Sequence, residues 1–96
     1  MTKEEREDFY DKAMEKWGLD AQLNMCIEEM SELTKEICKF RRCGFLNKPT
    51  AEVQEHMMEE LADVYNMLDQ IARMFDREKI EQIRDEKIQR CMKKLQ

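Results

Sequence analysis

Two short acidic motifs are the residues in this chain with the clearest capacity for chemistry. Residues 28–32 read EEMSE and residues 59–63 read EELAD, so both follow the pattern acid-acid-x-x-acid. On a helix, residues three or four apart lie on one face, so each motif presents a compact group of carboxylates whose like charges repel. A divalent cation relieves that repulsion, and carboxylate oxygens are ligands that suit Mg²⁺ or Mn²⁺.

The positions of these acids within their helices weaken the alternative interpretation, a solvated acidic face. At about 100° per residue, Glu60 falls inside the edge of an apolar sector and Asp63 lies at its border. Glu29 takes a similar border position on the preceding helix, beside Cys26 and Leu33. A carboxylate at such a border faces a neighbour and needs a cation or hydrogen bonds. The apolar sector around Glu60 is formed by Leu61, Val64, Tyr65, Leu68, Ile71, Ala72 and Phe75.

Four helices are expected to position the motifs, which makes the fold class all-α. Apolar residues at helical spacing predict the first three helices over residues 3–17, 21–42 and 51–75, and a fourth after residue 76. The first is expected to use one side for packing, formed by Phe9, Ala13, Met14 and Trp17.

Local signals predict where these helices begin and end. Gly18 is expected to break the first helix, and Asp20 to cap the second. Gly44 follows a basic last turn and is the predicted C-cap of the second helix, with a loop over residues 44–49. Thr50 and Asp76 are the predicted N-caps of the third and fourth helices.

Length and composition predict a single domain over residues 1–96 that gains stability by self-association. The chain has 96 residues, only two Gly and one Pro, and is 42% hydrophobic. A single core of this size is modest. The third helix is apolar over more than a narrow stripe, as expected if it contacts its own chain and a partner. We therefore expect oligomerisation to complete the core, with a homodimer as the minimum and a homotetramer as the larger alternative.

Several other classes of protein are disfavoured. The net charge is −5 and the basic residues form no stripe, so no nucleic-acid partner is expected. Four Cys without a CxxC pair, and a single His, argue against a zinc site. The residue three before His56 is Val53, which excludes the Glu-x-x-His motif of di-iron bundles. No segment resembles a signal peptide or membrane span, so a cytoplasmic protein with reduced thiols and no membrane partner is expected.

The two motifs resemble those of the MazG-like, all-α nucleoside triphosphate pyrophosphohydrolases. The signature of that family is ExxE, a spacer and ExxD, which correspond here to residues 29–32 and 60–63. The segments KWG at residues 16–18 and AQL at residues 21–23 also look like those of short stand-alone members found in bacteria and their phages. The resemblance extends over nearly the whole chain.

The resemblance implies both a reaction and roles. The family hydrolyses a nucleoside triphosphate, NTP or dNTP, between the α- and β-phosphates to give a monophosphate and pyrophosphate. The implied cofactor is Mg²⁺, with Mn²⁺ as the alternative. The implied catalytic pair, as further ligands or as groups that orient the attacking water, is Glu28 and Glu59. The implied metal ligands are Glu29, Glu32, Glu60 and Asp63.

Further polar residues are candidates for contacts with the substrate. Gln22 lies two helical turns before Glu29 and could hydrogen-bond a base or sugar, and Asn66 shares the side of Asp63. Basic residues after the first motif suit the outer phosphates, although they equally suit a helix C-terminus. The basic candidates are Lys39, Arg41 and Arg42, with Lys79, Lys87 and Arg90 of the last helix as contributors from another subunit. The acidic residue Glu36 continues the face of Glu29, either as an outer-shell residue or as a solvated one.

Two other functions remain open at this stage. One is a helical scaffold or partner-binding module that keeps the fold without turnover. The other is a related all-α pyrophosphatase that acts on phosphoribosyl-ATP or dUTP. A complete acidic set against an apolar seam argues against the scaffold, and the short chain disfavours the larger dUTPase-like forms.

Overall fold

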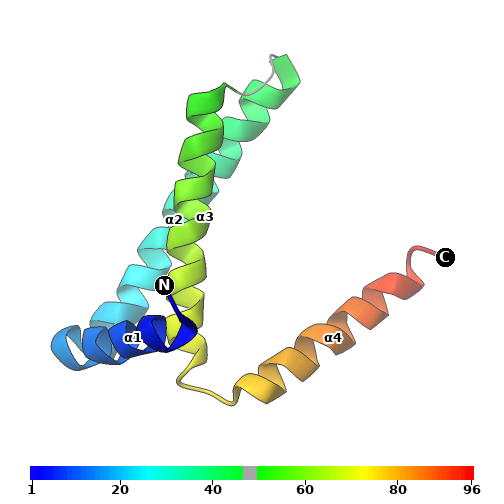
Figure 1. Ribbon diagram of the computed structural model, residues 1–96. Coiled ribbons are helices and arrows are strands. Elements are labelled where there is room, and N and C mark those ends of the chain that lie inside the picture. The colour runs from blue at the N-terminus through cyan, green and yellow to red at the C-terminus, as the bar shows by residue number, and fades with distance from the viewer. Residues whose placement is uncertain (47–49) are drawn as a thin grey trace.

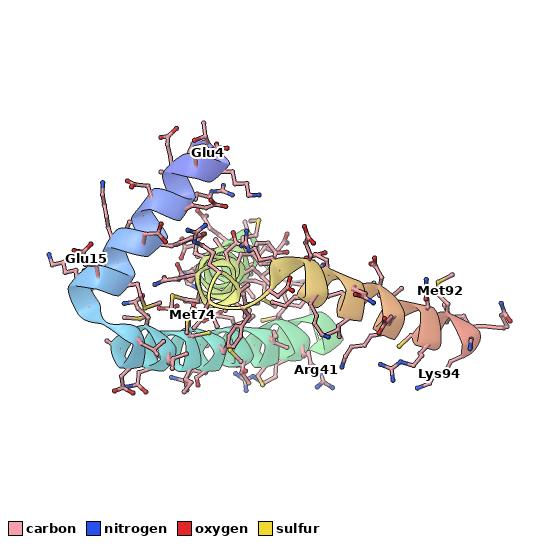
Figure 2. All side chains as sticks on the ribbon, turned by 90° about the horizontal axis from the view of Figure 1, so that it is seen from below. Glu4, Glu15, Arg41, Met74, Met92 and Lys94 are labelled. Atoms are coloured by element: carbon pink, nitrogen blue, oxygen red, sulfur yellow. The ribbon has the colours of Figure 1, made fainter. Side chains whose placement is uncertain are left out.

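The computed structural model describes residues 1–46 and 50–96, with side chains for 1–43 and 50–96. These residues form four helices and no strand: α1 (Lys3–Trp17), α2 (Leu19–Leu46), α3 (Ala51–Ala72) and α4 (Arg77–Lys93). The predicted all-α class is confirmed. Helices α2 and α3 lie side by side as a long antiparallel hairpin, α1 crosses its lower end, and α4 points away from it (Figure 1). Glu15 of α1 and Met92 of α4 lie on opposite sides of α3 when the molecule is viewed from below (Figure 2).

The predicted helix ends are confirmed where capping chemistry specifies them. Gly18 has a φ of 87°, which side chains disfavour, and its N–H donates to Met14 O at 2.9 Å. The side chain of Thr50 accepts from Val53 N at 3.2 Å, and that of Asp76 accepts from Lys79 N at 3.1 Å. These bonds satisfy N–H groups that a helix start would otherwise leave without partners.

The predicted bounds of α2 are wrong at both ends. Because Gly18 already supplies the break, α2 begins at Leu19 and Asp20 lies in its first turn instead of capping it. The helix also runs through Gly44 to Leu46, so Gly44 is not a C-cap. A glycine inside a helix costs only about 0.5–1 kcal/mol, which is too little to end a helix alone. The remainder of the predicted loop, residues 47–49, lies outside the described residues.

Helix α3 also ends earlier than predicted. It stops at Ala72, and the following backbone tightens, with Met74 N donating to Ile71 O at 3.0 Å and Phe75 N to Ala72 O at 3.1 Å. Such i→i+3 bonds are a common way to finish a helix. Phe75 therefore lies in the turn that leads to α4 and not on α3.

The core lies along the α2–α3 seam and under α1. Tyr10 replaces Phe9 as the packing residue of α1, because Phe9 and Trp17 are each 54% exposed. The predicted packing side of α1 is therefore correct for Ala13 and wrong for Phe9 and Trp17. Among the side chains that the structure describes, the buried apolar ones are Tyr10, Ala13, Cys26, Val64 and Met67.

Charged side chains hold α1 against the end of α3. The Arg73 guanidinium binds the Asp11 carboxylate through both oxygens at 2.9 and 3.0 Å, and it reaches Glu7 at 2.9 Å. The Tyr10 hydroxyl donates to Asp69 Oδ2 at 3.4 Å. A two-oxygen contact of this kind fixes geometry as well as adding energy. These contacts orient α1 across the hairpin.

Apolar side chains of both hairpin helices are exposed. On α2 they include Ile27, which is 62% exposed. On α3 they include Tyr65 and Leu68, which are 68% and 50% exposed and, three residues apart, form an exposed apolar face of that helix. At about 100° per residue, Ile27 stands about 160° from Glu29 on its helix, and Tyr65 about 160° from Asp63. Each is therefore turned away from the acid on its own helix. None of the side chains of α4 is buried either.

In the described part of the chain, no helix combines the length and the apolar character needed to cross a membrane.

One buried hydrogen bond links α2 to α3 within the seam. Gln70 Nε2 donates to Gln22 Oε1 at 2.9 Å, and the two residues are only 4% and 7% exposed. A buried amide that loses its partner costs its desolvation energy, whereas replacing both partners by apolar groups is nearly neutral.

We expect Gln70→Leu to lower the free energy of unfolding by about 1–3 kcal/mol, because the Gln22 amide would lose its partner. The double variant Gln22→Leu/Gln70→Leu should recover most of that loss. Urea unfolding followed by circular dichroism measures both. A double variant less stable than the single one would show that the two glutamines do more for stability than satisfy each other's hydrogen-bonding groups.

Candidate metal centre

The structure brings three of the predicted metal ligands together across the hairpin. Glu29 of α2 meets Glu60 and Asp63 of α3, and one carboxylate oxygen from each lies within 4.8 Å of the others. Glu60 and Asp63 are three residues apart, so they share one face of α3. The antiparallel packing of α2 places Glu29 opposite that face. We call this group, Glu29, Glu60 and Asp63, the carboxylate triad.

Burial and mutual repulsion raise the pKa of two members of the triad. For Glu29 the main cause is desolvation, followed by the charges of Asp63 and Glu60 and by a hydrogen bond with Asp63. For Glu60 desolvation again leads, followed by the charges of Asp63, Glu32, Glu36 and Glu59. Both effects disfavour the ionised form, since nearby negative charges and a low dielectric each penalise a carboxylate.

Among the described side chains, two buried carboxylate oxygens lack a hydrogen-bond partner. One is Glu60 Oε2, within the triad itself, and the other is Glu36 Oε2, two helical turns after Glu29 on α2. A buried carboxylate oxygen without a donor or a cation carries a large desolvation cost. Oxygen ligands of high negative charge that lack protein donors fit a hard divalent cation such as Mg²⁺. The triad therefore has both the chemistry and the unsatisfied capacity for a metal ion.

The other predicted acids, Glu28, Glu32 and Glu59, lie outside the triad. Glu32 is exposed and pairs with Lys35 at 3.4 Å, yet its charge raises the pKa of both Glu29 and Glu60. The charge of Glu59 also acts on Glu60. Glu28 is exposed, and its side chain is not part of the triad.

The predicted substrate-binding residues fall in several places. Gln22 is buried against Gln70, two helical turns along the seam from Glu29. Lys39 Nζ contacts Glu36 Oε1 at 3.3 Å, so it lies beside the acidic cluster. Arg42 is exposed near the far end of α2, and Asn66 is exposed one turn beyond Asp63. The α4 residues Lys79, Lys87 and Arg90 are also exposed, on the helix that points away from the hairpin.

The sequence pattern leaves Glu36 open between an outer-shell and a solvated residue, and it does not single out Gln70. Glu36 is only 9% exposed, which rules out its interpretation as a solvated residue. Both lie seven residues from a triad member, Glu36 after Glu29 and Gln70 after Asp63. A spacing of two helical turns returns a residue to nearly the same face. The signal that identifies Glu36 and Gln70 in the sequence is therefore this seven-residue spacing from an acid of each motif.

A separate groove lies away from the triad. It is open, has a volume of about 1320 Å³ and is lined mainly by α3 and α4, with Tyr65, Leu68, Phe75 and Ile80 among its apolar residues and charged residues beside them. Asn66 also lines it, but no member of the triad does. An open groove without convergent catalytic groups is a packing surface more than a reaction site. The triad, and not this groove, is therefore the candidate reaction site.

Comparisons with protein-family models, curated proteins and solved structures find no match.

The raised pKa values make the effect of metal on stability depend on pH. Because Glu29 and Glu60 bind protons more readily in the folded protein than in the unfolded one, they add stability below the ordinary glutamate pKa. That contribution is lost as the pH rises through their folded pKa values. At neutral pH a bound divalent cation would take the place of the protons.

We therefore expect Mg²⁺ to raise the Tm near neutral pH, and this increase to shrink at about pH 5, where protons compete for the same oxygens. Mg²⁺ at about 100 times its Kd adds about 2.7 kcal/mol, which raises the Tm of a small domain by on the order of 10 °C. Glu29→Gln should abolish the increase, while Glu55→Gln, on an exposed part of α3, should keep it. Thermal melts with Mg²⁺ or EDTA measure the effect. An equal increase at both pH values would contradict binding at the triad.

Proposed function

We propose that this protein is a Mg²⁺-dependent nucleoside triphosphate pyrophosphohydrolase. The reaction would cleave an NTP or dNTP between the α- and β-phosphates, releasing a monophosphate and pyrophosphate. The observation that carries the proposal is the carboxylate triad, drawn from both acidic motifs and bordered by buried carboxylate oxygens without partners. The choice of nucleoside triphosphates rests on the resemblance of these motifs to the MazG-like enzymes.

The acids would have different roles, metal binding or orientation of water, according to their positions. The triad, with Glu32 one turn along α2, would hold Mg²⁺ at the hairpin seam. Glu59 and Glu28 would orient the attacking water or complete the coordination. A bound Mg²⁺ supplies charge neutralisation for the phosphates and lowers the pKa of water. Such a reaction depends on positioning and charge stabilisation, so no nucleophilic Ser or Cys is needed.

Cations near the cluster would contact the outer phosphates. Lys39 already lies beside the acids through Glu36, and Arg42 is exposed farther along α2. A substrate with several negative charges would draw such flexible side chains from solvent. The free Cys residues at 26, 38, 43 and 91 are consistent with a reducing cytoplasm as the place of action.

Self-association is the second part of the proposal. The exposed apolar side chains of the hairpin, and an α4 without a buried side chain, offer apolar surface that association would cover. A homodimer that packs these faces together, or a homotetramer, would cover them while leaving the acidic side of each hairpin open.

We expect the wild-type protein to sediment as a dimer or tetramer at micromolar concentration. Leu68→Glu, in the exposed apolar face, should shift the equilibrium toward the monomer, because a charge would be buried without a partner. Glu55→Gln should not shift it. Analytical ultracentrifugation distinguishes these states, and a folded wild-type monomer at this concentration would defeat self-association.

A substrate panel tests the reaction. With Mg²⁺ and each common NTP and dNTP, we expect pyrophosphate and a monophosphate as products. Asp63→Asn should lower kcat by on the order of 100-fold or more, since even residues that only orient metal ligands cost 10–100-fold. Glu55→Gln should retain activity.

The products separate the proposed reaction from the alternatives. Release of orthophosphate would contradict cleavage between the α- and β-phosphates. Turnover confined to dUTP or phosphoribosyl-ATP would assign one of the related pyrophosphatases. No product with any nucleotide, and no effect of Asp63→Asn, would favour a helical scaffold.

A further inference from the structure

Helix α4 is attached to the rest of the molecule at its first turn only. Arg77 and Ile80 are half-buried, and the other residues of α4 are exposed. The turn before α4 adds little apolar packing, because Met74 and Phe75 are themselves 41% and 64% exposed. A segment with few buried contacts has a low local stability. Another interaction is therefore needed to fix the direction in which α4 leaves the hairpin (Figure 1).

Arg77 supplies that interaction through charge. Its Nη2 donates to the backbone carbonyl and to Oδ1 of Asp69 on α3, at 3.3 and 3.2 Å. Its Nη1 lies 3.7 Å from Glu7 Oε1 on α1. Among the described residues, every hydrogen bond or ion pair between an α4 side chain and another helix is made by Arg77. Other side-chain pairs of α4, such as Arg84–Glu81, lie within the helix.

The same junction also holds α1. Glu7 pairs with Arg73 through Oε2 at 2.9 Å and faces Arg77 with Oε1, so one carboxylate joins α1 to the end of α3 and to the start of α4. Asp69 likewise accepts from Arg77 and from the Tyr10 hydroxyl. The direction of α4 therefore depends on the docking of α1.

We propose that Glu7, Asp69 and Arg77 form a salt-sensitive latch that fixes the direction of α4 and couples it to α1. The side chains of Glu7, Arg77 and Asp69 are 29%, 37% and 52% exposed, so salt reaches them. The Debye length falls from about 8 Å at 0.15 M salt to about 3 Å at 1 M, which is comparable with these contact distances. Release would free α4 to turn about residues 73–76. The latch lies outside the carboxylate triad, so it neither requires nor supports the proposed reaction.

The latch controls the position of a basic face. The chain after Glu86 contains four cations and no acid, and all four are exposed. At about 100° per residue, they fall within about 120° of the helix circumference. With the latch closed, this face is held out on a helix that points away from the hairpin and its acidic motifs (Figure 1). The four cations are Lys87, Arg90, Lys93 and Lys94.

Distances between spin labels on the chain's own thiols test the latch. Cys38 of α2 and Cys91 of α4 are exposed and accept labels, whereas Cys26 is buried. The parent protein and every variant carry Cys43→Ser, which removes the remaining thiol. Labelled chains are diluted with excess unlabelled chains, so the measured distances lie within one chain. Double electron–electron resonance then gives the distribution of the distance between the two labels.

We expect one narrow distribution for the parent, and a distribution about twofold wider in Arg77→Gln, because α4 loses its charged anchor. Arg84→Gln, which removes the same charge from a pair within α4, should leave the distribution unchanged. Glu7→Gln should widen it, while Asp8→Asn, whose partner on α1 is Lys12, should not. NaCl at about 1 M should widen the distribution of the parent and leave that of Arg77→Gln unchanged. Circular dichroism checks that each variant is helical.

Each part of the inference has its own contrary result. An unchanged distribution in Arg77→Gln would overturn the latch, and so would equal widening in Arg84→Gln. Widening in Arg77→Gln without any change in Glu7→Gln would overturn the coupling to α1. A parent distribution that does not respond to salt would overturn the salt sensitivity and assign the direction of α4 to the packing of Ile80.

Discussion

The central constraint on this molecule is the placement of like charges at a packed helix seam. Glu29, Glu60 and Asp63 approach one another where α2 meets α3. Partial burial and the charges of neighbouring acids raise the pKa of the two glutamates, while Asp63 is exposed. The packing of α2 on α3 is what brings acids from two helices together. The hairpin therefore stores repulsion that protons or a cation relieve, which links its stability to the chemistry it can perform.

The rest of the fold supports this arrangement from three directions. The Gln22–Gln70 bond joins α2 to α3 along the seam, and the ion pairs of Arg73 orient α1 across it. Exposed apolar side chains such as Ile27 and Tyr65 are turned away from the triad acid on their own helix, so covering them would leave the acids accessible. Helix α4 adds no buried side chain to the seam and extends away from it (Figure 1). The proposed chemistry and the proposed association therefore use different residues of the hairpin.

Much of this could be predicted from the sequence because it depends on local patterns. The helix ends at Gly18, Thr50 and Asp76 follow from backbone freedom and capping, which involve only neighbouring residues. The triad follows from helical spacing, since a border position on each of two long helices implies contact once they pack. The predicted C-cap at Gly44 is wrong, because a glycine is only a weak signal for a helix end when the flanking residues continue the helix.

Other features depend on contacts between distant residues. Gln70 looks like an ordinary polar residue until Gln22 is placed opposite it. Glu36 could be interpreted either as solvated or as an outer-shell acid, and only its burial in the packed structure excludes the first. Tyr10 rather than Phe9 packs in α1 because the crossing of α1 over the hairpin, held by Arg73, sets which face is covered. These contacts between residues of different helices cannot be predicted from periodicity along one helix.

The most direct measurement of the central claim is a crystal structure of the protein grown with Mn²⁺, using anomalous diffraction to locate the ion. The account predicts an anomalous peak at the α2–α3 seam, within coordinating distance of carboxylate oxygens from Glu29, Glu60 and Asp63. A fully ordered triad without an anomalous peak, or Mn²⁺ bound only at other acids of the surface, would contradict it.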